Sequence, residues 1–174
     1  MGFRILTIKG WSMSPTLRNE DAVLCQDVLF GRGIERGQIV SLIPPQHSPE
    51  ELVATKYVCK RVVAVAGDLV HSTKGVLYVN KEVYNEGAYG KTPDIQPLVI
   101  PRGHVYVLGD NREHSFDSSF YGPVKARKVK HVFCRKLKAK EVKRNRKGDR
   151  YRPKDFKSVY NACLKEIEKK WGID

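Results

Sequence analysis

The chain has 174 residues, 41% of them hydrophobic, and a formal net charge of +13. This length predicts one domain, or one domain with an appendage, whose core buries about two thirds of the unfolded chain's surface, so the fold needs no disulfides. The charge excess is confined to residues 125–157, which hold 16 Lys+Arg and 3 Asp+Glu, and this excludes a uniformly basic nucleic-acid-binding domain.

The N-terminal third predicts three strands and one polar loop. Apolar and polar residues alternate over residues 3–9, which indicates a strand. A loop follows over residues 11–21, where Ser12 offers a hydroxyl beside a proline. Such a hydroxyl at a strand end suits a nucleophile, but the same residues are also ordinary turn chemistry. Further strands are expected over residues 22–29 and 37–43.

The middle of the chain predicts a dense set of short strands. Residues 56–66 are the most strand-like run, and residues 69–71 and 76–80 flank a Lys-Gly hairpin turn. An extended loop with short strands is expected over residues 81–100. Strands should also form over residues 105–108 and 124–137, the latter half-exposed.

The C-terminal part differs in composition. Residues 138–154 are charged and predict a solvated basic linker. Apolar residues then recur every three or four positions, which predicts an amphipathic helix over residues 155–174. This helix would either dock on the body or anchor the chain peripherally to a membrane, with Trp171 at the interface. Residues 1–137 would form the β domain.

The cysteines and histidines give no metal-binding pattern. The four cysteines contain no Cys-x-x-Cys pair and have no metal-like spacing with the five histidines; they are Cys25, Cys59, Cys134 and Cys163. We expect small buried thiols, no metal and no cofactor.

Many short strands with Gly/Pro turns, and almost no helix before residue 154, favour a mostly β fold. We expect an antiparallel sheet closed into something barrel-like. No run of 18 apolar residues occurs, so no spanning helix is predicted.

Three stretches occur in a distinctive order. They are Ser-Met-x-Pro-Thr from Ser12, Lys-Arg-Val from Lys60, and Gly-Asp-Asn-x-x-x-Ser-x-Asp-Ser from Gly109. Together they resemble the type I signal peptidase family, the Ser/Lys membrane proteases, over roughly residues 8–135. The third stretch and the Pro-Arg-Gly-His run before it look most like the mitochondrial inner membrane protease branch, subunit 2 type. The resemblance implies the β-rich fold that this family shares with LexA-type repressors.

The resemblance identifies Ser12 as the nucleophile and Lys60 as its general base. An unperturbed lysine has a pKa of about 10.4, and full burial lowers the pKa of a lysine by up to about 3 to 5 units. Strand alternation would point Lys60 inward beside Val58 and Val62, and Arg61 outward. On the residues alone Lys60 would be one more surface lysine, and Lys56 is its one local rival.

The remaining site residues also follow from the resemblance. The backbone N–H of Ser12 would meet the oxyanion, while Gly10 replaces a hydroxyl that some bacterial members place there. Ser115 matches a serine that hydrogen-bonds the catalytic lysine. Asp117 matches a structural carboxylate, and Asp110 lies in the supporting turn.

The predicted site also includes one departure from the family pattern, at Ser119, and an assignment of the residues that line the substrate pocket. Ser119 stands where many bacterial members have an arginine that pairs with the aspartate, and the subunit 2 branch also lacks that arginine. Met13 and Leu17 are expected to line the substrate pocket and to meet lipid. No metal is expected in this site.

The predicted function is an endopeptidase that removes N-terminal sorting or signal peptides from membrane-translocated proteins. Its partners would be precursor polypeptides, a paralogous protease subunit in a heterodimer, and a membrane surface, at the intermembrane-space side of the mitochondrial inner membrane. Family members usually carry an N-terminal membrane anchor, so this chain has either lost it or docks by other means.

Two alternatives stay open. A bacterial-type signal peptidase for secreted proteins, at a bacterial cytoplasmic membrane, is favoured by the long stretch over residues 71–100, which resembles a bacterial insertion. A LexA-like module that binds nucleic acid through the basic tail is the other, although few stacking aromatics interrupt that tail, so nucleic acid is not an expected partner.

Overall fold

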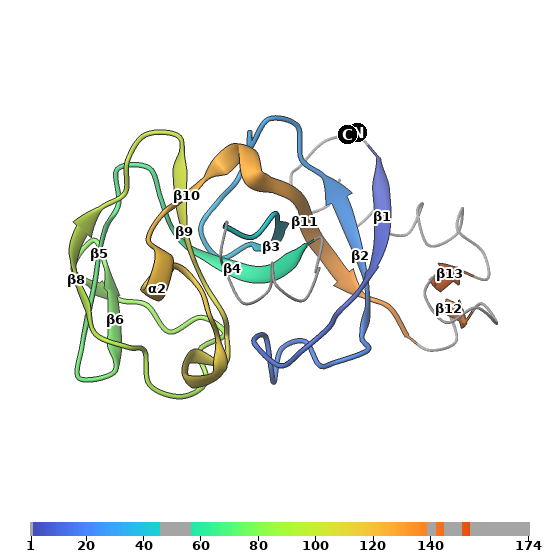
Figure 1. Ribbon diagram of the computed structural model, residues 1–174, viewed down its shortest axis with the longest axis horizontal. Helices are drawn as coiled ribbons and strands as arrows, with labels where there is room; N and C mark the ends of the chain where they lie inside the picture. The colour runs from blue at the N-terminus through green and yellow to red at the C-terminus, as the bar shows by residue number, and fades with distance from the viewer. Residues whose placement is uncertain (1, 46–56, 139–141, 145–150, 154–174) are drawn as a thin grey trace.

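The computed structural model describes residues 2–45, 57–138, 142–144 and 151–153, the last two segments as backbone only. The described chain is mostly β and forms three antiparallel sheets (Figure 1). Helical structure there is limited to three short pieces: η1 (Arg112–His114), α2 (Ser118–Tyr121) and η2 (Ala126–Lys128).

The largest sheet has seven strands in the order β1-β2-β11-β3-β4-β9-β10. Their bounds are β1 (Phe3–Thr7), β2 (Ala22–Asp27), β11 (Val129–Lys136), β3 (Ile39–Leu42), β4 (Val58–Val65), β9 (His104–Leu108) and β10 (Val124–Lys125). Strand β11 lies between β2 and β3, so a late segment of the chain separates two early ones.

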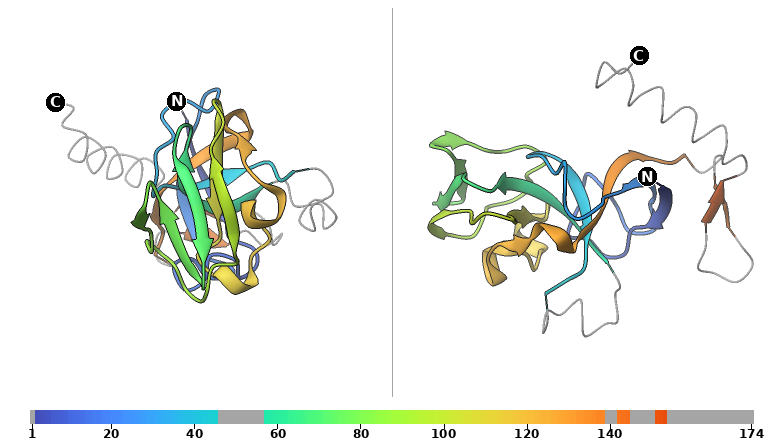
Figure 2. Two further views of the ribbon diagram at one scale, coloured as in Figure 1. Left: turned by 90° about the vertical axis from the view of Figure 1, so that its left-hand side faces the viewer. Right: turned by 90° about the horizontal axis from the view of Figure 1, so that it is seen from above.

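A second sheet has four strands in the order β7-β6-β5-β8, and it lies at the left of Figure 1 and faces the viewer in the left panel of Figure 2. These strands are β5 (Leu69–Thr73), β6 (Val76–Val79), β7 (Glu82–Val83) and β8 (Ile95–Val99). The hairpin of β5 and β6 turns at Lys74 and Gly75, both with positive φ, which confirms the hairpin prediction.

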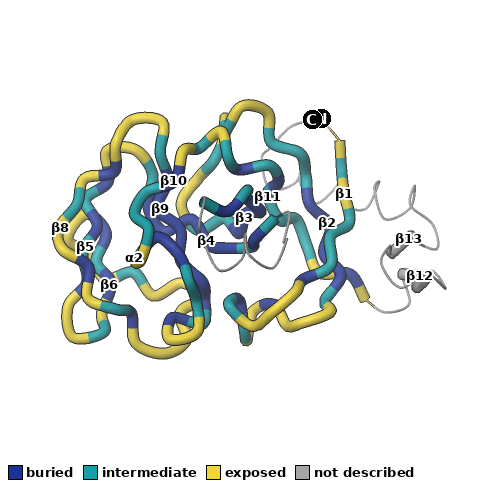
Figure 3. Tube along the Cα trace, viewed as in Figure 1, coloured by how far each residue is buried: buried dark blue, intermediate teal, exposed yellow. Residues whose placement is uncertain are grey.

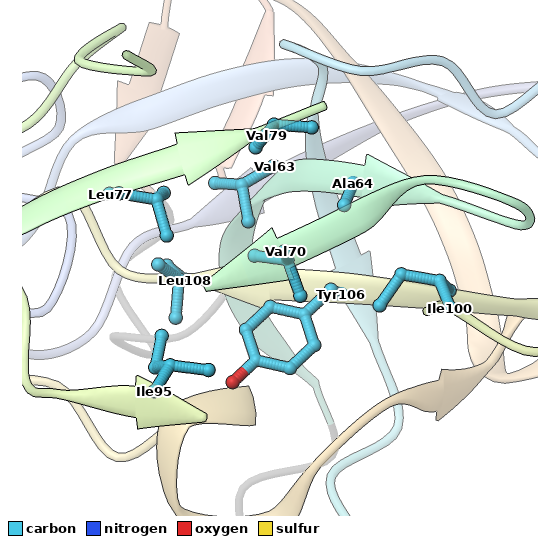
Figure 4. Close-up of a cluster of buried hydrophobic side chains, with 9 residues drawn as sticks. All are labelled: Val63, Ala64, Val70, Leu77, Val79, Ile95, Ile100, Tyr106 and Leu108. Atoms are coloured by element: carbon cyan, nitrogen blue, oxygen red, sulfur yellow. The ribbon is translucent and has the colours of Figure 1, made fainter. Parts of the chain in front are cut away.

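A hydrophobic cluster joins the two sheets. Val63, Ala64, Tyr106 and Leu108 of β4 and β9 pack against buried residues of β5, β6 and β8, such as Val70 (Figure 4). Burying each large aliphatic side chain contributes about 1.5–3 kcal/mol relative to leaving it exposed. The second sheet therefore covers one face of β4 and β9, and Figure 3 shows the central strands as the most buried part of the chain.

A second cluster lies in the seven-stranded sheet, where Val40, Val62 and Val107 have no exposed surface. Strand β4 thus contributes side chains to cores on both of its faces. A strand that is buried on both faces has a nearly continuous apolar sequence. This explains why residues 56–66 form the most strand-like run in the sequence.

The strand predictions are confirmed, but the closed barrel is wrong. β1 and β10 lie at opposite ends of the seven-stranded sheet, and within residues 2–45 and 57–138 no ladder joins them. Strands β5 to β8 pair with one another in a separate sheet, and β1 and β10 each pair with a single strand of the described chain, so the first sheet stays open. Strand β10 is also only two residues long.

The predicted basic linker contains two short strands, β12 (Val142–Arg144) and β13 (Tyr151–Pro153), which pair antiparallel. The predicted helix over residues 155–174, with Cys163 and Trp171, lies outside the described residues, as does Lys56. In the part of the chain that is described, no helix has the length and apolarity needed to cross a bilayer.

Candidate active site

The loop that carries Ser12 is anchored by buried side chains on either side of it. Ile8 closes the loop, because its N–H donates to the carbonyl of Asp21 at 2.8 Å and its carbonyl accepts from Glu20 N–H at 2.9 Å. Met13 and Leu17 are almost fully buried beside Ile8 in one hydrophobic cluster. Burial holds the loop down while Ser12 stays half-exposed.

The prediction that Met13 and Leu17 meet lipid is therefore wrong. Both side chains point into the core, where they hold the loop, and only Met13 also contacts the cleft described below. Sequence alone could not separate an apolar residue under a loop from one on its surface.

Lys60 comes from the fourth strand and reaches the serine loop. Its Nζ donates to Ser12 Oγ at 3.0 Å, and the residue is 1% exposed. The apolar strand positions Val58 and Val62 are also buried. An ammonium ion removed from water is disfavoured relative to the neutral amine, and a neutral amine can accept a proton.

Arg61 is buried as well, contrary to the outward orientation predicted for it. It does point to the opposite face from Lys60, but that face is covered. Its Nε and Nη2 donate to the two carboxylate oxygens of Asp110 at 2.8 and 2.7 Å, and Nη1 donates to the Gly37 carbonyl at 2.8 Å. The side chain of Asp110 has no exposed surface.

Thr16 completes a link among all three sequence motifs. Its hydroxyl donates to Asp110 Oδ2 at 2.6 Å. The serine loop, the strand with Lys60 and the 109–118 segment are therefore tied together through one carboxylate. Thr16 and Arg61 belong to the recognised motifs, yet sequence reasoning assigned neither of them this role.

Asp110→Ala should lower the free energy of unfolding by about 3–5 kcal/mol, because it removes the buried carboxylate that pairs with the Arg61 guanidinium and leaves, among the described residues, only the exposed Glu86, whose Oε1 lies 3.3 Å from Arg61 Nη1. Urea unfolding followed by circular dichroism would measure the change. Asp94→Ala, at an exposed position, is the control and should stay within about 0.5 kcal/mol of the unsubstituted chain. Equal stability of the two variants would contradict a buried ion pair.

Asp117 organises the end of the 109–118 segment. It caps α2 by accepting from Ser119 N–H at 3.1 Å and from the Ser119 hydroxyl at 2.8 Å, and it accepts from Gly109 N–H at 2.8 Å. Many bacterial members have an arginine at position 119 that pairs with this aspartate. Here the Ser119 hydroxyl takes its place by donating a hydrogen bond to the Asp117 carboxylate. These bonds are consistent with a supporting role for Asp117, not one in the chemistry.

Ser115 lies next to Gly109, but its hydroxyl makes no hydrogen bond in the described chain. The bond to Lys60 that the resemblance implies is therefore not present. The Ser115 oxygen is buried and has no partner among the described residues, and it lies near the Ser12 carbonyl, because a Cβ added at Gly109 would meet both atoms.

At Ser12 the backbone carbonyl accepts a backbone hydrogen bond, whereas the backbone N–H donates none in the described chain. Ser12 O accepts from Asn111 N–H at 3.0 Å, and the Asn111 amide group donates to Trp11 O at 3.3 Å. No backbone bond among the described residues uses the Ser12 N–H. This N–H can therefore serve an oxyanion, and Gly10 adds no side-chain donor.

Ser12 and Lys60 open into a cleft of about 490 Å³. It is lined by residues 6–13 and 57–60, together with His114 and Phe116. The ladder between β4 and β3 begins at Val58, whereas the ladder between β4 and β9 begins only at Arg61. In the described chain, the backbone of residues 58–60 thus has one edge without a paired strand.

Cys59 is half-buried in this cleft, and burial raises the pKa of its thiol to about 11, an effect that Lys60 partly offsets. We expect iodoacetamide to react slowly with Cys59 at pH 8, because its thiolate fraction is roughly 240-fold below that of a free cysteine of pKa about 8.5. The rate should rise as the pH approaches 11. Mass spectrometry of each cysteine, with the urea-unfolded chain as the control, would measure it, and equal rates would contradict an enclosed thiol.

A second group of side chains superficially resembles a catalytic triad. Ser41 Oγ lies 2.6 Å from His131 Nδ1, and His131 Nε2 lies 3.5 Å from Asp27 Oδ1. However, Ser41 is 2% exposed within β3 and does not line the cleft. A substrate carbonyl cannot reach this hydroxyl, so the group is structural.

The described residues hold no cluster of three or more His, Cys, Asp or Glu side chains that could bind a metal. Among the described residues, Cys25, Cys59 and Cys134 form no disulfide bond.

A family model described as signal peptidase, peptidase S26, matches residues 1–133. Thylakoidal processing peptidase 1 of Arabidopsis thaliana is 37% identical over 126 residues, which are 68% of this chain and 37% of that protein. Mitochondrial inner membrane protease subunit 1 of Mus musculus is 31% identical over 121 residues, covering 69% of this chain and 60% of that protein. Subunit 2 of the same species is 30% identical over 126 residues, covering 69% and 58%.

The chain therefore spans about a third to three fifths of the length of these relatives. A crystal structure of a signal peptidase I from Enterococcus faecalis aligns with a TM-score of 0.44 and 24% identity, over 58% of this chain and 97% of that one.

Proposed function

This chain belongs to the signal peptidase family, peptidase S26, and we propose that it is a serine endopeptidase that removes N-terminal sorting or signal peptides from membrane-translocated proteins. The observation that carries the proposal is the 3.0 Å contact between Ser12 Oγ and the buried Nζ of Lys60. A hydroxyl alone attacks an amide poorly at neutral pH, and an adjacent neutral amine supplies the missing base.

The reaction begins when the neutral Lys60 amine takes the proton of Ser12 as Oγ attacks the substrate carbonyl. The Ser12 N–H donates to the oxygen that becomes negative in the tetrahedral intermediate. The Lys60 ammonium then gives its proton to the leaving amine, and the C–N bond breaks to leave an ester on Ser12. Water, deprotonated by the same amine, hydrolyses this ester and restores both side chains.

An extended polypeptide suits the shape of the site. Its backbone would pair with the free edge of residues 58–60, which places a carbonyl between Lys60 and Ser12. The family prefers small residues just before the cleaved bond. Ile8 and Met13 are buried side chains that also contact the cleft, so they are the residues we assign to its floor.

The proposal is tested by incubating the purified chain with a peptide that spans a precursor's signal cleavage site. Mass spectrometry should find one cut, after a small residue. Ser12→Ala should remove this activity, whereas Ser14→Ala, on the same loop but without a role in the chemistry, should keep it. Cleavage by the Ser12→Ala protein would refute the assignment of the nucleophile.

The location and partners are proposed more broadly. Mitochondrial inner membrane protease subunits and thylakoidal peptidases are both among the relatives, so each membrane remains compatible with the family. We propose the mitochondrial inner membrane, with a paralogous subunit as partner and precursor proteins as substrates. Cell fractionation followed by cross-linking would test both parts, and recovery of the chain from plastid or bacterial membranes would overturn the location.

A further inference from the structure

A second hollow, of about 600 Å³, lies beside the segment that holds the catalytic loop in place. It is lined by residues 74–75 and 91–93, by Arg112, Glu113 and Ser115, and by Phe120. We call it the Arg112 hollow. It shares no lining residue with the cleft that contains Ser12 and Lys60.

Two residues that line the Arg112 hollow each carry a buried hydrogen-bond donor without a partner in the described part of the chain. Arg112 is 2% exposed, and its Nε and Nη1 are fixed by the Gly109 carbonyl at 3.0 Å and the Thr92 hydroxyl at 2.7 Å. Its Nη2 has no partner, and neither has the buried hydroxyl of Ser115. An unsatisfied buried polar group costs about 1–3 kcal/mol, and more when it is charged, so two in one hollow call for an acceptor.

The nearby carboxylates do not supply this acceptor. Both oxygens of Asp110 are used by Arg61 and Thr16. Those of Asp117 accept from Gly109 and Ser119.

The surroundings of the hollow are cationic. Lys74 and Lys91 are exposed residues that line it, and the one carboxylate lining it, Glu113, accepts from the backbone N–H of Lys91 at 3.2 Å. Burial lowers the pKa of the Arg112 guanidinium, which is the direction expected of a cation that lacks a sufficient counter-charge.

We propose that the Arg112 hollow is an anion-binding site in which a carboxylate or phosphate group accepts hydrogen bonds from Arg112 Nη2 and Ser115 Oγ. A guanidinium with one free N–H beside a hydroxyl is suited to such an oxygen pair. The exposed amines of Lys74 and Lys91 strengthen the attraction. This inference goes beyond the proposed peptidase activity and does not depend on it.

The site is joined to the cleft through the chain itself. Glu113 and Ser115 line the Arg112 hollow, whereas the intervening His114 and the following Phe116 line the cleft. Ser115 is extended, with φ −135° and ψ 131°, so successive side chains point to opposite sides. A bound anion would therefore fix the wall that separates the two cavities.

Binding is tested without substrate, so its outcome is separate from that of the peptidase proposal. Sodium phosphate, sodium acetate or a short acidic peptide is titrated into the isotope-labelled chain at constant ionic strength, with chloride as the reference. The Arg112 Nε–H resonance should shift and saturate. Saturation by the peptide and acetate identifies a polypeptide carboxylate as the source, and saturation by phosphate alone identifies a free phosphate.

Three variants decide whether the shift comes from the Arg112 hollow. Ser115→Ala removes a donor and should weaken binding about tenfold, and Lys91→Ala should weaken it about three- to fivefold. Lys125→Ala, an exposed lysine away from the hollow, should bind as the unsubstituted chain does. A shift that never saturates with any of the three anions overturns the proposal, as does equal binding by all three variants.

Discussion

Lys60→Met should lower kcat/KM for peptide cleavage by about 10⁴-fold or more, because Ser12 loses the only base that the structure places within hydrogen-bond reach of its hydroxyl among the described residues. Methionine keeps a similar length and volume, so the apolar surroundings of the side chain stay filled. The rate is measured with the peptide that spans a cleavage site, with enzyme in excess of peptide but below saturation, so that the observed single-turnover rate constant divided by the enzyme concentration gives kcat/KM.

The same substitution should leave the protein folded and at least as stable. Lys60 is 1% exposed, and replacing a buried amine by an apolar side chain removes the cost of keeping a polar group out of water. Activity lost without stability lost is the signature of a residue kept for chemistry. Lys125→Met is the control and should change neither property, and a Lys60→Met protein that cleaves at the normal rate would show that another group is the base.

The contrast between Lys60 and Arg61 shows what strand periodicity can predict. Alternation placed the two side chains on opposite faces, and the structure agrees. It could not show that the second face is covered, because that cover comes from residues about fifty positions later in the chain, Asp110 above all. The sequence therefore predicts that the charged residue after the proposed base points outward, although Arg61 is buried and paired.

The sheet topology could not be predicted either, because it also depends on contacts between residues that are far apart in the sequence. Period and turn residues predicted where nearly every strand lies, but they contain no signal for which strand lies beside which. Strand β11 inserts between β2 and β3, and the four strands from Leu69 to Val99 form their own sheet. These pairings are long-range contacts. They produce an open seven-stranded sheet and a separate four-stranded sheet, and not the closed barrel that we expected.

The 109–118 segment shows the limit of a resemblance. It correctly drew attention to Asp110, Ser115 and Asp117, all of which lie close to the serine loop or support it. It did not predict the geometry of Ser115, a residue that lines the Arg112 hollow and whose hydroxyl makes no hydrogen bond to Lys60. The motif fixes which residues are present, whereas rotamer and hydrogen-bond partner depend on neighbours such as Gly109 and Arg112.

Gly109→Ala should lower kcat by about 10²-fold or more while the core of the protein stays folded. A Cβ at this position would lie 2.5 Å from the carbonyl oxygen of Ser12 and would also overlap the side chain of Ser115. The Ser12 carbonyl cannot move aside freely, because Asn111 N–H holds it at 3.0 Å. The added methyl group must therefore shift the backbone of the nucleophile away from Lys60.

Comparison with two further variants separates this displacement from other effects. Gly103→Ala creates strain at a φ of +74° but meets no atom within 4 Å, so it should lose about 1–2 kcal/mol of stability and no activity. Ser115→Gly combined with Gly109→Ala removes the Ser115 overlap and leaves the contact with Ser12, so the double variant should stay slow. If the double variant recovered the normal rate, the effect would come from Ser115, and the position of the Ser12 backbone would not be what Gly109 protects.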